Sequence, residues 1–172
     1  MPNIEIERKF LVLNEDYKQL ATSKYTIIQG YICKDAGRTV RVRIRTNDDG
    51  SSVAFLTIKS KPNAMGFSRF EWEKEIDPSD AKQLIHLCLP GVIKKTRWLI
   101  PANPPSPIAN NQSPITNNPS PHLTWEVDEF HGRLAGLVIA ELELESEDQA
   151  FEKLSFVGEE VTGNPRYYNA NM

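Results

Sequence analysis

The sequence is poor in the residues that staple small domains or build the commonest metal and nucleotide sites. It contains two cysteines, Cys33 and Cys88, which form no CxxC pair. A disulfide scaffold and a cysteine zinc site are therefore excluded, and this cysteine usage suits a cytoplasmic location. The three histidines show no metal-ligand spacing. Neither GxxxxGKS/T nor GxGxxG is present, so no glycine-rich turn of that kind holds a phosphate.

Long apolar runs and an excess of positive charge are lacking as well. The longest apolar runs, such as residues 10–13, are too short to span a membrane, and charges from Glu5 onward exclude a signal peptide. Lys and Arg number 20 against 23 Asp and Glu, a formal net charge of −3, which excludes a general basic nucleic-acid binder. We therefore expect neither a membrane nor a nucleic acid as a partner. The 172 residues predict one domain, 1–172.

The charges that are present are sorted along the chain. Residues 38–61 contain six basic side chains against two acidic ones, and residues 126–160 contain eleven acidic side chains against two basic ones. The small net charge therefore conceals a basic segment and an acidic segment.

Hydrophobic patterning predicts about eight strands and a few short helices. Strands are expected at residues 3–13, 24–34, 39–46, 52–61, 67–77, 92–100, 124–130 and 138–145. Helices are expected at residues 14–22, 78–89 and 147–154, and the tail from residue 156 is expected to be a turn followed by irregular structure. Because turns join most of the strands, the pattern favours an antiparallel α+β fold.

The segment Pro101–Pro121 differs from the rest of the chain. It has seven prolines and no charge, so it can neither pair in a sheet nor form a helix. We expect a disordered Pro/Asn-rich loop insertion between two strands. A tolerated surface insertion is favoured over a ligand for a proline-binding module.

Charged side chains recur at alternate positions in seven of the predicted strands, and alternate residues of a strand share one face. These faces carry Glu5, Glu7 and Lys9; Arg41, Arg43 and Arg45; Lys59 and Lys61; Glu71, Glu73 and Glu75; Lys95 and Arg97; Glu126 and Asp128; Glu141, Glu143 and Glu145. A half-buried sheet with a solvated outer face is one interpretation. A barrel with its charged face inward is the other. Several strands carry one sign only, and like charges repel unless the opposite sign lies between them, which favours the barrel.

Such a barrel would enclose a wet, polar tunnel, and helices would cover its apolar outer face. Arg and Lys on some walls would bind a polyanion, because the guanidinium fork matches phosphate oxygens. Carboxylates on other walls would bind a hard divalent cation. The opposed walls predict a phosphate chain with a bridging metal as the ligand. Trp72, Trp98 and Trp125 have the opposite strand parity, so we expect them to pack beneath the outer helices.

An ordered set of motifs carries a family resemblance over nearly the whole chain. Glu5-Ile6-Glu7-Arg8-Lys9 forms an ExExK motif near the N-terminus. It is followed by QGYI at 29–32, RVRIR at 41–45, TIKSK at 57–61, EWEKEI at 71–76, KTRW at 95–98, WEVDEF at 125–130, AELELE at 140–145 and GEEVTGNPRYYN at 158–169. The set resembles the CYTH superfamily, the triphosphate tunnel metalloenzymes, and is most similar to its short bacterial members. The proline-rich insertion departs from the family pattern.

The resemblance implies a closed antiparallel eight-stranded β-barrel with a charged interior and short helices outside. It also implies a divalent-metal-dependent hydrolase that converts inorganic tripolyphosphate to pyrophosphate and phosphate with Mg²⁺ or Mn²⁺. A thiamine- or nucleoside-triphosphatase, a class IV-type adenylate cyclase and a non-catalytic polyphosphate-binding module stay open as alternatives. A homodimer is a further possibility.

The resemblance assigns roles to residues of this sequence. The substrate-binding set is Lys9, Arg41, Arg43, Arg45, Lys59, Lys95 and Arg97. The metal-binding set is Glu5, Glu7, Glu141, Glu143 and Glu73. The catalytic set is Glu71, Glu73, Lys9 and Arg43, with Glu126 and Asp128 as helpers.

Overall fold

The computed structural model describes residues 4–35, 37–63, 68–102 and 123–172. Its strands are β1 (Ile4–Val12), β2 (Ser23–Asp35), β3 (Arg38–Asn47), β4 (Ser52–Ser60), β5 (Ser68–Ile76), β6 (Ile93–Pro101), β7 (Thr124–Phe130), β8 (Val138–Glu143) and β9 (Val157–Glu160). Its helices are α1 (Tyr17–Leu20) and α2 (Pro78–His86), with 3-10 turns at Gly132–Leu134, Pro165–Tyr167 and Asn169–Asn171. None of the helices in these ranges is long and apolar enough to cross a membrane.

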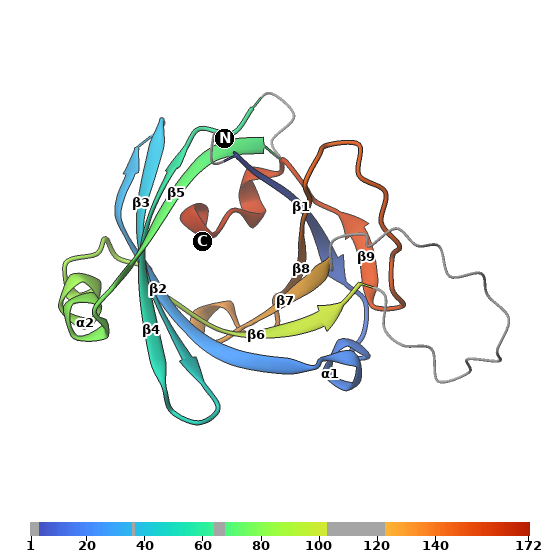
Figure 1. The fold of residues 1–172 in the computed structure, drawn as a ribbon, viewed down its shortest axis with the longest axis horizontal. Coiled ribbons are helices and arrows are strands. Elements are labelled where there is room, and N and C mark those ends of the chain that lie inside the picture. Colours follow the sequence, from blue (N-terminus) through green and yellow to red (C-terminus); the bar gives the residue numbers. More distant parts are fainter. Residues whose placement is uncertain (1–3, 36, 64–67, 103–122) are drawn as a thin grey trace, which may run out of the picture.

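The strands β1 to β8 close into a barrel, as Figure 1 shows. They follow the order β5-β4-β3-β2-β6-β7-β8-β1, and all the pairings are antiparallel. Strand β1 closes the ring because its first residues, 4–6, pair with β5 and its residues 7–11 pair with β8. The short β9 pairs with β1 outside the ring. The predicted α+β fold with an eight-stranded closed barrel is confirmed.

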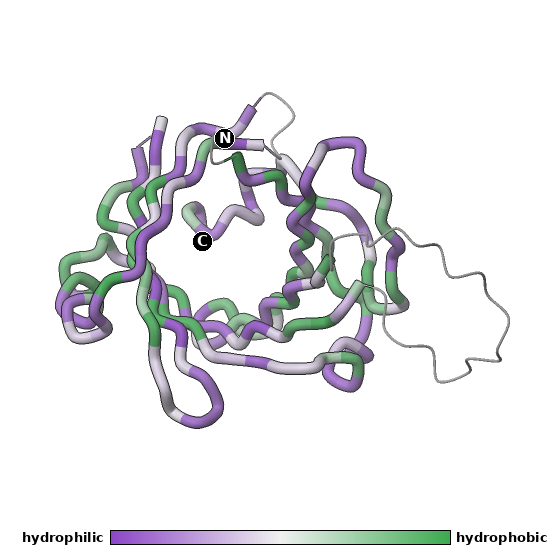
Figure 2. The backbone as a smooth tube through the Cα atoms, in the orientation of Figure 1, coloured by the Kyte–Doolittle hydropathy of each residue, from purple (hydrophilic) through white to green (hydrophobic). Residues whose placement is uncertain are grey.

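Hydrophilic and hydrophobic residues alternate along the strands (Figure 2), as a barrel with a polar interior requires. On the outside, α2 covers β3 and β4 with the buried Ala81, which packs with Val42, Ile44 and Ala54. Asp77 caps this helix by accepting a hydrogen bond from the Ser79 amide at 2.7 Å. The predicted start of this helix is thus confirmed, with Asp77 as its N-cap.

A second outer cluster, whose buried members include Phe10, Trp125 and Phe156, packs against α1 and against the segment that follows β8. Residues 147–154 contain no helix, so that prediction is wrong. Phe151 packs instead with edge-on ring contacts on Phe10 at 5.9 Å and on Trp125 at 5.7 Å, and this packing outweighs helix propensity. Helix α1 spans residues 17–20, shorter than predicted, and Tyr17 packs on Trp98.

The tryptophans divide between core and surface. Trp125 is completely buried and Trp98 packs against the same cluster, as predicted. Trp72 is 37% exposed, so its predicted core position is wrong. It pairs with Ile58 in register, and Ile58 is 37% exposed as well, because α2 packs further along these strands over Ala54.

The C-terminal segment is more ordered than predicted. After β9 it forms two 3-10 turns, and Tyr167 and Met172 pack on the buried Ile93, Phe130 and Ile139. Figure 1 shows this segment across the barrel ring. The predicted loop insertion begins too early at 101, because Pro101 ends β6 opposite Thr124 and the Ala102 amide donates to the Leu123 carbonyl at 2.8 Å. Residues 103–121, the rest of that prediction, lie outside the described residues.

Candidate active site

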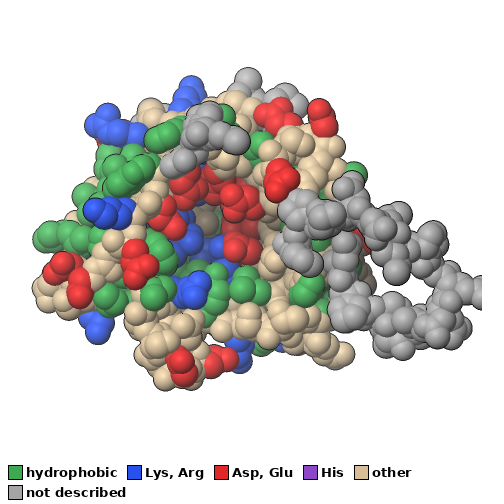
Figure 3. All heavy atoms as spheres, in the orientation of Figure 1, with side chains coloured by type: hydrophobic (Ala, Val, Ile, Leu, Met, Phe, Trp, Pro, Cys, Tyr) green, Lys and Arg blue, Asp and Glu red, His purple; other side chains and the backbone are tan. Residues whose placement is uncertain are grey.

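A cavity of about 770 Å³ fills the barrel interior, and charged side chains line it from all eight strands of the barrel. Figure 3 shows acidic and basic side chains together in this hollow. The cavity gathers nearly all the predicted site residues: Glu5, Glu7, Lys9, Arg41, Arg43, Arg45, Lys59, Glu71, Glu73, Arg97, Glu126, Glu141 and Glu143. Lys95 and Asp128 lie behind this lining and are 1% and 0% exposed.

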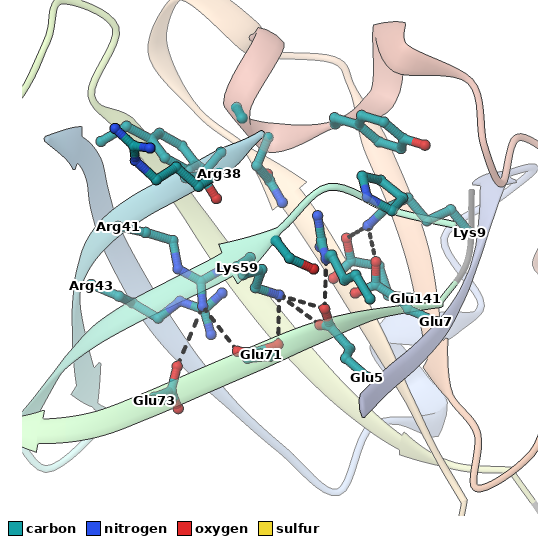
Figure 4. Close-up of a pocket in the computed structure, with 18 of the residues that line it drawn as sticks. Glu5, Glu7, Lys9, Arg38, Arg41, Arg43, Lys59, Glu71, Glu73 and Glu141 are labelled. Carbon is teal, nitrogen blue, oxygen red and sulfur yellow. Dashed lines mark hydrogen bonds and ion pairs between the residues drawn. The ribbon is translucent and has the colours of Figure 1, made fainter. Parts of the chain in front are cut away.

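One wall of the cavity comes from β3, β4, β5 and the start of β1. Lys59 Nζ donates to Glu5 Oε1 at 2.6 Å and pairs with Glu71 Oε2 at 2.8 Å. Arg41 Nη2 lies 3.4 Å from Glu73 Oε2 and 3.9 Å from Glu71 Oε1 (Figure 4). Lys59 and Arg41 therefore have carboxylates as neighbours that they can exchange for phosphate oxygens.

The opposite wall comes from β1, β6, β7 and β8. Lys9 Nζ pairs with Glu7 at 2.5 Å and with Glu141. Arg97 donates to both oxygens of Asp128, at 2.7 and 2.6 Å, and to Glu141 at 2.7 Å. Buried carboxylates thus hold Arg97 on this wall in a fixed, multiply hydrogen-bonded position.

Arg43 and Arg45 differ from Lys9, Arg41, Lys59 and Arg97, because no carboxylate of the described residues lies within ion-pair distance of either. Arg43 Nε donates to Gln29 Oε1 at 3.4 Å, and the Arg45 guanidinium lies 4.5 Å from the centre of the Tyr25 ring. Burial and the nearby Arg41 and Arg97 charges lower the pKa of Arg43. These two guanidinium groups are available to an anionic ligand.

The pKa values of the cavity lysines differ. Burial opposes charge on Lys9, but Glu141 and Glu7 outweigh it and raise its pKa. Burial lowers the pKa of Lys59, and the adjacent Arg41 lowers it further. Burial also lowers the pKa of Lys95 to about 8, against the opposing effect of Asp128. Lys95 therefore loses its charge as pH rises through about 8, well below the ordinary range of a lysine.

The carboxylates face one another across β1, β7 and β8. Glu7 is directly opposite Glu143, and Glu126 is directly opposite Glu141. Burial and the surrounding carboxylates, led by Glu5 and Glu126, raise the pKa of Glu143 to about 7. Like charges at such positions are unfavourable without a cation between them.

This donor set fits a hard divalent cation, because carboxylate oxygens are the ligands that Mg²⁺ and Mn²⁺ prefer. Within the described residues, no three acidic, histidine or cysteine side chains already converge into a metal cage. Glu7 and Glu141 instead form ion pairs with Lys9, and Glu5 forms one with Lys59. A bound cation would take over these carboxylates from the lysines, and the metal-binding roles of Glu5, Glu7, Glu141, Glu143 and Glu73 stay predictions.

Sequence reasoning missed several residues of the interior, among them four on β2, β4 and β5. Arg69 Nε donates to Glu5 Oε2 at 2.9 Å, and Tyr31 lines the cavity. Thr57 is 0% exposed; its Oγ1 donates to Glu73 at 2.6 Å and accepts from Arg41 at 3.1 Å. Gln29, which contacts Arg43, is also 0% exposed. Their strand parity could have revealed them, since each lies two residues from another interior position.

The chain resembles known proteins over almost its full length. A family model described as the CYTH domain matches residues 3–170. An inorganic triphosphatase of Acetivibrio thermocellus is 40% identical over 98% of this chain and 92% of its own length. An inorganic triphosphatase of Nitrosomonas europaea is 32% identical over 96% of this chain and 93% of its own length.

Solved structures agree with this similarity. The crystal structure of the inorganic triphosphatase NE1496 has a TM-score of 0.56 at 29% identity and covers 97% of this chain and 92% of its own. The protein HpAC1 from Hippeastrum has a TM-score of 0.55 at 16% identity, covering 83% and 80%, and shares the fold.

Proposed function

Because the chain belongs to the CYTH domain family, we propose that it hydrolyses inorganic tripolyphosphate to pyrophosphate and phosphate with Mg²⁺ or Mn²⁺. The observation that carries this proposal is a cavity lined by carboxylates and by Arg43 and Arg45, neither of which has a carboxylate partner among the described residues. A chain of phosphates with a bridging cation complements both the guanidinium groups and the carboxylates. The inorganic triphosphatases that resemble the chain over nearly its whole length support the same substrate.

The basic residues would bind and orient the phosphate chain. Arg43 and Arg45 would meet phosphoryl oxygens directly, and Lys9, Arg41, Lys59 and Arg97 would exchange part of their carboxylate contacts for phosphate. Lys95 would add positive charge from behind the lining. Glu5, Glu7, Glu141, Glu143 and Glu73 would hold the divalent cation. When bound, this cation neutralises charge on the phosphoryl oxygens.

Glu71 and Glu73 on β5 would orient the attacking water and accept its proton. Burial and the neighbouring Glu5 raise the pKa of Glu71, although Lys59 opposes them, which suits Glu71 to accept a proton. The oxygen of a water held by Glu71 or Glu73 would bond to the terminal phosphorus in line with the breaking P–O bond. The bridging oxygen then leaves with pyrophosphate, and the water proton passes to the carboxylate. No serine or cysteine nucleophile is needed.

An organic triphosphate is the second candidate substrate. Tyr25 and Phe55 line the cavity beside the arginines, and aromatic rings can stack on an organic group. Thiamine triphosphate, nucleoside triphosphates and cyclisation of ATP therefore belong in the test. A non-catalytic phosphate-binding module is disfavoured, since pure anion binding has no use for so many carboxylates. We also propose a cytoplasmic location, which the two free cysteines support.

A substrate panel tests the proposal. The purified chain is incubated with tripolyphosphate, thiamine triphosphate and ATP, each with Mg²⁺, with Mn²⁺ and with chelator, and phosphate, pyrophosphate and cyclic AMP are measured. We expect turnover of tripolyphosphate that requires the metal and exceeds that of the organic substrates. Tight binding without turnover of any triphosphate would establish a binding module instead.

A further inference from the structure

Gln29 is a buried polar side chain that faces the barrel interior from β2. It is 0% exposed and pairs in register with Arg43 on β3. Its Oε1 accepts a hydrogen bond from Arg43 Nε at 3.4 Å. Its Nε2 has no hydrogen-bond acceptor within the described part of the chain. The carbonyl half of this amide therefore contacts Arg43, and the NH₂ half has no partner among the described residues.

Arg43 dictates which way the amide points. The reverse orientation would set the amide NH₂ against the Arg43 Nε–H, which is also a donor. The observed orientation leaves a buried NH₂ unpaired, which is unfavourable and uncommon in folded proteins. An apolar side chain of the same length would avoid this penalty, so the fold alone gives no reason for an amide here.

Arg43 gives the reason, because no carboxylate of the described ranges holds it as carboxylates hold its neighbours. Arg41 lies beside Glu73, and Arg97 is held by Asp128. A carboxylate at position 29 would also orient Arg43, but it would neutralise the charge that a phosphate needs. A neutral carbonyl oxygen orients the guanidinium and leaves its charge available.

We propose that Gln29 is a positioning residue whose carbonyl oxygen holds the Arg43 guanidinium in place for a phosphoryl group of the substrate. Gln29 does not line the cavity, so it acts through Arg43. The adjacent backbone is well placed to anchor it, because the Leu89 amide donates to the Tyr31 carbonyl at 2.8 Å. This inference rests on the proposed function, in which Arg43 binds the triphosphate.

A double-mutant cycle tests the proposal with Gln29→Met, Arg43→Ala and the double variant. Gln83→Met, on the exposed face of α2, is the matched control. The readouts are KM and kcat for tripolyphosphate at saturating metal, together with the melting temperature. We expect Gln29→Met to raise KM roughly tenfold with a smaller change in kcat and no loss of melting temperature. In the Arg43→Ala background the same change should alter KM less than about twofold.

A second variant separates orientation from charge. Gln29→Glu keeps the length and the acceptor but adds a negative charge beside Arg43, so it should raise KM more than Gln29→Met does. It also provides the test if the Met variant does not fold.

Equal effects of Gln29→Met in both backgrounds would overturn the positioning role, because a purely structural contribution is additive. An unchanged KM in both folded Gln29 variants would overturn it as well. If Arg43→Ala alone has wild-type kinetics, the premise that Arg43 binds phosphate is wrong. If the wild type hydrolyses no triphosphate, the proposed function fails, and this inference fails with it.

Discussion

At the scale of single residues, the cations of the interior differ in whether a carboxylate neutralises them. Lys9, Lys59 and Arg97 are held by carboxylates, whereas Arg43 contacts the neutral Gln29. A triphosphate brings several negative charges into this cavity, so the least neutralised guanidinium groups should gain most from binding it.

Lys95 provides a pH dependence at this scale. Its pKa of about 8 lies below the ordinary value of 10.5, so the free protein loses this positive charge as pH rises through about 8. We expect kcat/KM for tripolyphosphate to fall above that pH, and the fall in kcat to occur at higher pH because bound phosphate stabilises the ammonium. A pH profile of both parameters checks this.

Lys95 also makes the free energy of unfolding depend on pH, and this quantity rises where kcat/KM is expected to fall. Because its folded pKa is lower than its unfolded pKa, the unfolded chain binds more protons between about 8 and 10.5, so this group's contribution to stability increases over that window. Lys95→Arg should remove both effects, because arginine keeps its charge. An unchanged alkaline fall of kcat/KM in that variant would assign it to another group.

Thr57 offers a second residue-scale prediction. Its hydroxyl joins Arg41 to Glu73 while fully buried. Thr57→Val keeps the shape and leaves both groups with one partner fewer, so we expect roughly a tenfold loss in kcat/KM and about 1–2 kcal/mol in the free energy of unfolding. Kinetics and denaturant unfolding measure the two effects. Thr26→Val, at an exposed position, is the matched control and should change neither.

At the scale of elements, local pattern predicted β1 to β8: charged and apolar residues alternate along seven of them, and β2 is rich in Thr, Ile and Tyr. It missed β9, a four-residue strand that exists because it pairs with the edge of β1. It also placed a helix at residues 147–154, where Phe151 and Leu154 pack on the outer cluster instead. Both errors concern segments whose structure is set by tertiary contact rather than by local pattern.

The same distinction applies to the site. The charged lining was predictable because strand parity sorts charges onto one face and the family motifs assign roles to them. The neutral residues Gln29 and Thr57 were missed, since their importance depends on which charged neighbour they contact. The pairing of Lys9 with Glu141 depends on register between strands far apart in sequence, which no local pattern reveals.

The contact between α2 and β2 gives an element-scale prediction. A methyl group added at Gly30 would lie 2.7 Å from Cys88 Sγ and 2.8 Å from Cys88 Cβ. Gly30→Ala should therefore push the end of the α2 region away from the barrel and cost about 1–3 kcal/mol of stability. Thermal or denaturant unfolding measures the loss. Gly37→Ala, where nothing lies within 4 Å, should be nearly neutral, and equal losses in both variants would contradict the packing explanation.

At the scale of the whole molecule, the net charge of −3 is what remains after two opposed sets of charges cancel. It excluded a general basic binder of polyanions, but it concealed a cluster of cations enclosed within a near-neutral protein. Closing the sheet into a barrel brings part of each segment around one cavity: Arg38, Arg41, Arg43, Arg45, Lys59 and Lys61 of the basic segment, and Glu126, Glu141 and Glu143 of the acidic segment. The function proposed for this chain depends on that closure.

The central claim is that cations bind the phosphate chain while carboxylates bind the metal. The most direct test measures initial rates of tripolyphosphate hydrolysis over a grid of substrate and Mg²⁺ concentrations for the wild type, Arg43→Ala and Glu7→Gln. We expect Arg43→Ala to raise chiefly the substrate KM, roughly tenfold or more, and Glu7→Gln to raise chiefly the metal concentration at half-maximal rate. If both variants shift the same parameter, or neither differs from the wild type, the division of roles between cations and carboxylates is wrong.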